Sequence, residues 1–375
     1  MRTNTMIKQA SVLAVAAAFF TATADVSAES VMLKPKHKVG ETVYVEQSAE
    51  IVQLIHNPMM GEPMEIAIHR IYGLLRKTDS GSSDGAKMSW TFDRTMQKVD
   101  SPMMEAAYDS DAPGAEDESE LIAGPLNAMI GGKFNVEIDK DNTATSCSGM
   151  KAILDKAMED APGNPFSQQL QRELTDDRGR VNYGESMYLM YPNKEVNVGD
   201  TWKKTQRDLL PQIGKVVSRY EYKLDKITEE AGRKVAVISF KSTMEKDTSG
   251  KPADDVGPLG NADVKGTSSG TTTFDIERGM VTKSIANNET KIETKAKASD
   301  AKDGDEEEDG AQHSPPPGMK IEVKVKQTTL LMNEADRAKQ KEAAAKHAKE
   351  VKKAEPKKET KKPAKKSDAD EDEDE

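Results

Sequence analysis

Alternation of apolar and polar side chains is the feature that most constrains the fold of this chain. The segments with a period of two are 65–72, 133–139, 234–240 and 320–326. A strand with that period buries one face and exposes the other, as strands of antiparallel sheets commonly do. The sequence therefore predicts half-buried antiparallel strands over about residues 31–332.

Turn residues divide these strands into hairpins. Ala231-Gly232 and Arg278-Gly279 each stand between two apolar strand segments, where a tight turn is expected. A longer hairpin is expected with arms at 281–297 and 319–332. Strands adjacent in sequence should thus pair with each other.

Two short helices interrupt this pattern. Apolar residues at helical spacing between positions 150 and 161 precede Pro162-Gly163, and Pro165 can begin a second helix over 165–174. The predicted fold class is α+β, mainly antiparallel β. The expected architecture is a curved sheet or incomplete barrel, with the two helices at the crossover between two related halves.

A short internal similarity is the reason for expecting two halves. Val-Gly-Glu-Thr-Val at 39–43 recurs as Val-Gly-Asp-Thr-Trp at 198–202, each with a glycine turn before a strand. Common turn residues could also match by coincidence, and that alternative stays open. The predicted organisation is a signal peptide over 1–28, a first β-rich half with both helices over 29–180, a second half over 181–332, and a charged helical or disordered tail over 333–375.

The amino terminus has the pattern of a secretory signal. Arg2 and Lys8 precede an apolar run over 10–22, with small residues and a cleavage point expected before Asp25 or Glu29. An uncleaved anchor is the alternative. The mature protein is expected to be extracytoplasmic, periplasmic or secreted, and soluble, with its single cysteine, Cys147, either buried or in an intermolecular bridge.

Charge separates the predicted body from its appendages. Of 375 residues, 35% are apolar and 32% are charged, and the net charge is −11. Acidic segments at 109–120 and 298–318 are expected to be disordered. The tail is basic over 333–366 and acidic over 367–375, lacks an apolar stripe, and is therefore expected to be dispensable for folding. It could contact envelope polyanions, whereas the net charge argues against nucleic acid as the main partner.

The order of several motifs is similar to that of a known family. Segments 38–42, 108–110, 125–134, 148–150 and 196–202 together resemble an uncharacterised family of exported bacterial proteins, classed as a domain of unknown function. The resemblance implies secretion and a β-rich body. It brings no catalytic residues with it.

Catalytic motifs do not stand out. The chain has five histidines and no Gly-x-Ser-x-Gly element before a helix. The segment from Asp139 begins like a calcium-binding loop, but Ala144 stands where glycine is needed and Met150 where a bidentate glutamate is needed. We expect a protein that is not an enzyme and that needs no cofactor.

Methionine is unusually frequent, at 19 residues. His56, Met59, Met60, Met64 and His69 fall within 14 positions, and thioether and imidazole together suit Cu(I). These five residues are the candidate metal ligands. The competing interpretations are that methionine fills gaps in the core, or that it lines an adaptable apolar cavity.

Three functions remain open. The leading hypothesis is a non-catalytic extracytoplasmic binding or interaction protein that holds an apolar ligand or a partner segment in a Met-lined curved sheet. The alternative is a structural envelope protein that acts through its charged tail. A soft-metal binder is the third.

Overall fold

The computed structural model describes residues 30–82, 84–113, 119–160, 165–210, 213–249, 259–295, 316 and 318–354. The expected signal peptide, most of the acidic segment 298–318 and the end of the tail lie outside these residues.

Strands make up most of the described chain. They are β1 (Ser30–Met32), β2 (Thr42–His56), β3 (Met64–Ser82), β4 (Gly85–Ser101), β5 (Met104–Asp109), β6 (Lys133–Asp139), β7 (Ala144–Ser148), β8 (Glu195–Asn197), β9 (Thr201–Leu210), β10 (Gly214–Glu230), β11 (Arg233–Lys246), β12 (Asp263–Asp275), β13 (Met280–Glu293) and β14 (Lys320–Met332).

Helices fall between β5 and β9 and after β14. They are α1 (Glu120–Met129), α2 (Met150–Asp160), α3 (Pro165–Glu173), α4 (Asp176–Gly179), the π-helical segment η1 (Arg180–Glu185), α5 (Ser186–Tyr188) and α6 (Glu334–Ala354).

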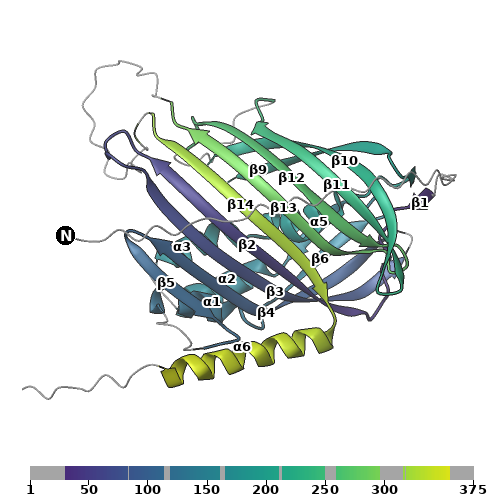
Figure 1. The fold of residues 1–375 in the computed structure, drawn as a ribbon, viewed down its shortest axis with the longest axis horizontal. Coiled ribbons are helices and arrows are strands. Elements are labelled where there is room, and N and C mark those ends of the chain that lie inside the picture. The colour runs from purple at the N-terminus through teal and green to yellow at the C-terminus, as the bar shows by residue number, and fades with distance from the viewer. Residues whose placement is uncertain are drawn as a thin grey trace, which may run out of the picture.

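One large antiparallel sheet organises the protein (Figure 1). Its strand order is β7-β6-β4-β3-β2-β14-β13-β12-β11-β10-β9, with β5 also pairing to β4, while β1 and β8 form a separate pair. The two ends of this path, β7 and β9, do not pair with each other among the described strands. The sheet is therefore curved but open, and the prediction of a mainly antiparallel, curved α+β fold is confirmed.

Irregularities in the strand pairing help the sheet to curve. Single residues are skipped in the register at Asp79, Asp93, Asp225 and Thr282. Each such bulge bends its strand and increases the local twist. The long strands can therefore wrap around a core instead of lying flat.

The predicted turns are confirmed. Ala231 and Gly232 both have positive φ, 48° and 76°, as a two-residue turn between β10 and β11 requires. The glycines of the repeated motif also build the same local structure. The Gly40 N–H donates to the Thr78 carbonyl, and the Gly199 N–H donates to the Leu224 carbonyl in the corresponding place.

Helices α1 to α3 and the segment 176–188 cover the concave face of the sheet. Their apolar side chains join one core with the inner-facing side chains of the strands, including Trp90 and Phe134, whose rings stack 6.0 Å apart. The predicted helices at 150–161 and 165–174 correspond to α2 and α3. Helix α1 contains Pro125, and the polar segment 176–188 has a weak apolar pattern, which is why neither was expected.

Helix α6 folds back over the convex face, where it packs against β2 (Figure 1). The expectation of a tail without buried contacts is wrong at Arg337, which is only 6% exposed. Its guanidinium donates to Asp111 at 2.9 Å and to Asp93 at 2.9 Å, and it lies 4.7 Å from the ring centroid of Tyr44. A single charged side chain anchors the helix, a contact that an apolar-stripe criterion does not detect.

The acidic segment 109–120 is likewise ordered at its start, contrary to expectation. Asp109 accepts from Arg94 at 2.7 Å, and Asp111, with a side chain 1% exposed, lies between Arg94 and Arg337. Glu46 also faces Arg94, and Gln340 of α6 donates to it at 2.7 Å. We call this group the anchor, and its residues are Tyr44, Glu46, Asp93, Arg94, Asp109, Asp111, Arg337 and Gln340.

Two further sequence expectations concern the membrane and the cysteine. None of the helices in the described ranges is both long and apolar enough to span a bilayer. Cys147 is a half-buried free thiol packed close to Gly179. Burial, and next the charge of Asp176, raises its pKa to about 12, so the reactive thiolate is disfavoured.

Candidate ligand cavity

The concave face is not completely filled by the helices. A cavity of about 480 Å³ lies between the inner faces of β2 and β3 and the helical segment 173–186, and it reaches Tyr220 on β10. A neighbouring cavity of about 220 Å³ continues across β10 to β14. Both are bordered by Gln47, Asn182, Ser186, Tyr220 and Gln327, so they form one hollow. Its size is in the range of small-molecule sites.

Uncharged polar groups and aromatic rings alternate around this hollow. The amide and hydroxyl side chains are Gln47, Asn182, Ser186, Gln206, Ser268, Thr272, Ser284, Asn288, Gln327 and Thr329. The rings and methionines are Tyr72, Phe92, Tyr183, Met187, Met190, Tyr220, Tyr222 and Phe240. Such a lining can pack against apolar groups and also form hydrogen bonds to neutral polar ones.

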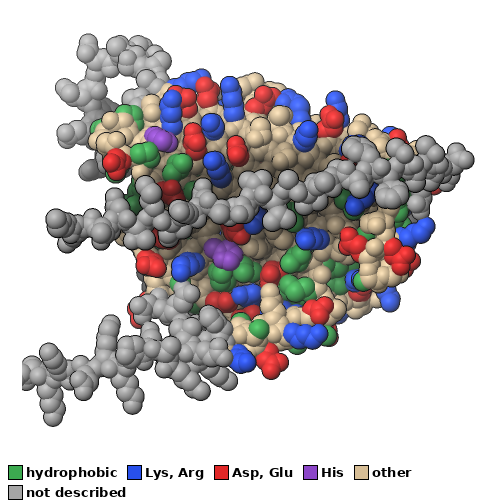
Figure 2. Space-filling model, in the orientation of Figure 1, with side chains coloured by type: hydrophobic (Ala, Val, Ile, Leu, Met, Phe, Trp, Pro, Cys, Tyr) green, Lys and Arg blue, Asp and Glu red, His purple; other side chains and the backbone are tan. Residues whose placement is uncertain are grey.

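Alternation along the strands explains why these residues share one face. Successive side chains of a strand point to opposite sides, so Gln47, Ala49 and Ile51 of β2 face the hollow while Glu46 and Glu50 face outward. The outward face carries lysines and acids interspersed, as Figure 2 shows. The two faces of one sheet therefore differ sharply in charge.

Charged side chains at one border of the hollow are paired. Arg70 donates to Glu173 at 2.9 Å and Arg178 donates to Asp208 at 2.7 Å. Burial alone would lower the pKa of Arg70, but the neighbouring Tyr72 and Glu173 raise it above its usual value. These pairs fix α3 and α4 against β3 and β9 and leave no net charge there.

Phenol groups in the hollow stay protonated. Burial raises the pKa of Tyr72 to about 12, and burial likewise raises the pKa values of Tyr220 and Tyr222. The Tyr220 and Tyr222 rings lie nearly parallel, with centroids 5.8 Å apart. At neutral pH these side chains therefore offer flat apolar surfaces and neutral hydroxyl groups.

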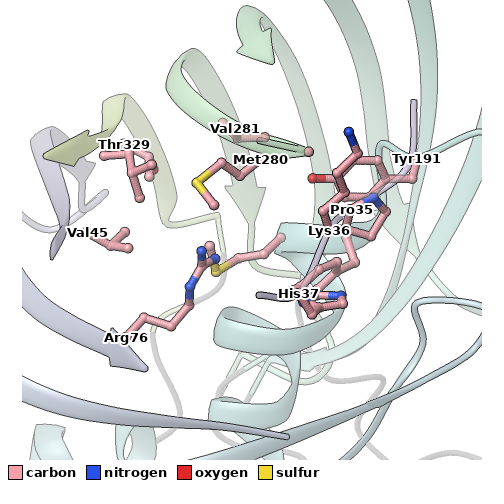
Figure 3. Close-up of a pocket in the computed structure, with 13 residues that line it drawn as sticks. Pro35, Lys36, His37, Val45, Arg76, Tyr191, Met280, Val281 and Thr329 are labelled. Carbon is pink, nitrogen blue, oxygen red and sulfur yellow. The ribbon is translucent and has the colours of Figure 1, made fainter. Parts of the chain in front are cut away.

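A smaller pocket of about 40 Å³ adjoins the hollow (Figure 3). It shares Met187, Val281 and Thr329 with the 220 Å³ cavity. Arg76 of β3 extends among His37, Val45 and Met280 in the view of Figure 3. The charged and imidazole side chains here thus come from β3 and from the segment between β1 and β2.

The structure places one of the five candidate metal ligands, His69, away from the other four. On β2, Glu50 is the register partner of His69, and His56 lies six positions further along, about 20 Å at the usual strand rise. Met59 and Met60 lie in the β2–β3 turn and are 79% and 53% exposed. Met64 begins β3. Met187 and Met190 border the hollow and Met280 borders the small pocket beside it, so methionine forms only part of the lining.

Several residues that border the hollow and the small pocket were not predicted from the sequence. Tyr220, Tyr222 and Phe240 lie at alternating positions of β10 and β11, a pattern that equally suits a filled core. Arg76 continues the inner-facing series of Arg70, Tyr72 and Leu74, so the period of two along β3 was the available signal. The approach of 176–188 to the sheet depends on tertiary packing and has no local sequence signature.

Known structures resemble the chain only loosely. A lipovitellin chain, from a structure titled "Lipid-protein interactions in lipovitellin", aligns with 80% of this chain at 6% identity and a TM-score of 0.40, and this chain spans about a quarter (26%) of its length. An outer membrane channel from Pseudomonas putida F1 aligns with 80% of the chain at 8% identity and a TM-score of 0.22, over 98% of the channel. OccK5 from Pseudomonas aeruginosa aligns with 78% at 8% identity and a TM-score of 0.23, over 99% of its length.

Comparison of sequences gives a firmer result. No curated protein matches the chain. A family described as a family of unknown function, DUF6263, matches residues 84–281, which is more than half of the 375-residue chain. This agrees with the resemblance found in the sequence motifs and with the β-rich fold. The chain belongs to the DUF6263 family of unknown function.

Proposed function

We propose that the protein is a non-catalytic, extracytoplasmic binding protein that holds an amphipathic organic molecule in the hollow of its curved sheet. The observation that carries this proposal is the lining of the hollow, where neutral amides and hydroxyls alternate with aromatic rings and methionines. Apolar parts of a ligand would pack against the rings. Its neutral polar groups would bond to the amides and hydroxyls.

The charges at the border support binding rather than chemistry. General acids and bases work from groups that are free to exchange protons with a substrate. Glu173 and Asp208 are instead paired with Arg70 and Arg178, and the phenols remain protonated. Export to the periplasm or the medium is part of the proposal and rests on the Arg2-Lys8 region and the apolar run after it.

The π-helical segment η1 strengthens the choice of this hollow. It contributes Asn182 and Tyr183 to the lining, and α5, which follows directly, contributes Ser186. Wider π turns occur often at functional sites and position side chains that a regular helix would direct elsewhere. Here the irregular segment borders the 480 Å³ cavity.

Blocking the hollow tests the proposal. Ala286 of β13 borders the cavity, and its neighbour Asn287 is exposed. We expect Ala286→Trp to reduce binding of a fluorescent amphiphile, the primary amide of 11-(dansylamino)undecanoic acid, by at least about tenfold, because the indole would fill the site. Asn287→Trp adds the same ring outside the cavity and should bind like the parent protein.

Two measurements support the proposal, and their failure contradicts it. The amide should titrate with an increase in dansyl emission, and native mass spectrometry of protein from its own cells should show a co-purified small molecule. Failure of both the amide and its parent acid to bind the protein, or equal binding by both tryptophan variants, would contradict a ligand site in this hollow. A function through the charged tail would then be favoured.

A further inference from the structure

An arginine without a counter-ion lies in the small pocket beside the hollow. The side chain of Arg76 is half-buried, it forms no hydrogen bond or ion pair with any residue in the described ranges, and its Nε is buried without a partner. Its guanidinium makes a cation–π contact with Trp90, 5.8 Å from the ring centroid, but this contact supplies no negative charge. Partly removing a cation from water without an anionic partner costs stability.

The other arginines that border the hollow each pair with a carboxylate. Arg70 has Glu173 at 2.9 Å and Arg178 has Asp208 at 2.7 Å. By contrast, the described lining of the small pocket contains no Asp or Glu, and it includes a second cation, Lys36, whose Nζ donates to the Ile276 and Glu277 carbonyls. The pocket is therefore electropositive although the chain as a whole is acidic.

A second polar group in this pocket also lacks a partner. Nε2 of His37 is buried with no hydrogen bond, and the imidazole lies 5.8 Å from the Tyr188 ring. Burial, and next the charge of Arg76, lowers the pKa of His37 to about 4, so the ring is neutral at physiological pH. The positive potential at the site thus comes from Arg76 and Lys36.

The small pocket is continuous with the hollow, and this limits the kind of molecule that can reach the charge of Arg76. Met187, Val281 and Thr329 border both the small pocket and the 220 Å³ cavity. A group bound at Arg76 can therefore be attached to a chain that lies along the rings of the hollow. The small volume at Arg76, about 40 Å³, suits a compact anion.

We infer that the ligand of the hollow is a single-chain amphiphile with a terminal carboxylate, and that the Arg76 guanidinium binds this carboxylate. This inference rests on the proposed function and names its ligand class. The planar guanidinium presents N–H groups in a fork that matches a carboxylate, and such charge-assisted bonds are stronger than neutral ones. The bound anion would supply the counter-ion that Arg76 lacks.

A pair of probes that differ only in charge tests the inference on the full chain. The acid, 11-(dansylamino)undecanoic acid, can place its carboxylate at Arg76 and its dansyl group in the wider cavity, whereas its primary amide is neutral. We expect the parent protein to bind the acid at least about tenfold more tightly than the amide. Arg76→Gln should remove this preference and leave the affinity for the amide unchanged within about twofold.

Arg219→Gln is the matched control. It makes the same change in net charge at a half-exposed arginine that pairs with Glu245 outside the hollow. Its preference for the acid should equal that of the parent protein. Equal affinities for acid and amide in the parent protein, or an unchanged preference in Arg76→Gln, would overturn the inference while leaving the proposed function intact. Binding of neither probe would overturn the proposed function itself.

Melting of the ligand-free protein gives an independent measurement. Arg76→Gln removes a half-buried charge that has no anionic partner, so we expect it to melt no lower than the parent protein. Residues kept for ligand binding at a cost in stability behave in this way. A fall in melting temperature of more than about five degrees would show that Arg76 supports the fold instead, and would overturn the inference.

Discussion

Two regions on opposite faces of the same sheet place arginine in different surroundings. In the anchor on the convex face, Arg94 and Arg337 meet Glu46, Asp93, Asp109 and Asp111. In the small pocket on the concave face, Arg76 meets no carboxylate among the described residues.

The comparison shows how structural and functional charges can be told apart. A buried ion network costs desolvation energy that its own pairings return, and its removal leaves charges unpaired. A half-buried arginine without a carboxylate partner has a desolvation cost that no ion pair returns, so its removal should not harm the free protein. The two regions therefore predict opposite outcomes for the same kind of substitution.

The largest effect is expected at the anchor. Arg337→Met leaves Asp111, 1% exposed at its side chain, with only the more distant Nε of Arg94 at 3.3 Å. We expect the free energy of unfolding to fall by about 3 kcal/mol, the cost of breaking a buried pair. Chemical denaturation measures it. A chain that ends at Asn333 loses the same contacts and should be destabilised similarly.

Lys339→Gln serves as the control, because Lys339 is on the same helix but 78% exposed at its side chain. Its effect should stay within about 0.5 kcal/mol. A loss below about 1 kcal/mol for Arg337→Met would mean that α6 is not held by the anchor, and would remove the contrast between the two faces.

An intermediate effect is expected from the packing beneath the anchor. A Cβ added at Gly73 would overlap the hydroxyl of Tyr44. The ring of Tyr44 in turn contacts the guanidinium of Arg337. Gly73→Ala should therefore displace Tyr44 and cost about 2 kcal/mol, as overpacking does. Gly61→Ala, in an open turn with no atom within 4 Å, should change stability by less than about 0.5 kcal/mol. Equal effects would show that Tyr44 moves freely.

Much of the fold could be predicted from the sequence, but little of the anchor or of the small pocket could. Alternation predicted the strands, and Ala231-Gly232 predicted its turn, because both signals are local. The anchor joins Asp93, Asp111 and Arg337, which are far apart in sequence and have no shared pattern. Charged residues are usually solvated, so nothing local distinguishes Arg337 from the exposed lysines of the same helix.

The sequence predicts a concave face where a cavity can form, but not the cavity itself. A curved sheet implies a concave face, and the period of two shows which residues point into it. Whether Tyr220 and Phe240 fill that space or border a hollow depends on how closely the segment 176–188 approaches, which is a tertiary property. Met59 and Met60 lie in a turn, where apolar side chains can stay exposed, and so they do not border the described hollow.

A smaller, pH-dependent effect tests the environment of Arg76. The pKa of His37 is about 4 in the folded protein, and that of an unfolded histidine is about 6.5. Between these values the unfolded chain binds a proton that the folded chain does not, so His37 favours unfolding as the pH falls from 6.5 toward 4. His37→Gln should lose less stability than the parent protein over this range and should match its pH dependence above pH 7.

Titration of His37 itself sharpens this result. Its ring resonances should show protonation near pH 4 in the parent protein and at a higher pH in Arg76→Gln, because the charge of Arg76 is the second cause of the lowered pKa. A titration near pH 6.5 in the parent protein would contradict both the burial of His37 and the positive potential attributed to the pocket.

The smallest effect is expected at an ion pair on the convex face that lies outside the anchor. Lys326 and Glu50 are 3.4 Å apart across β14 and β2, and their side chains are 56% and 60% exposed. A double-mutant cycle with Lys326→Gln and Glu50→Gln should give a coupling energy within about 0.5 kcal/mol, because water screens both charges. The same cycle on Arg337 and Asp111 should give a coupling several times larger. Similar couplings for the two pairs would show that position on the convex face, and not burial with matched carboxylates, decides what an arginine or lysine contributes to this fold.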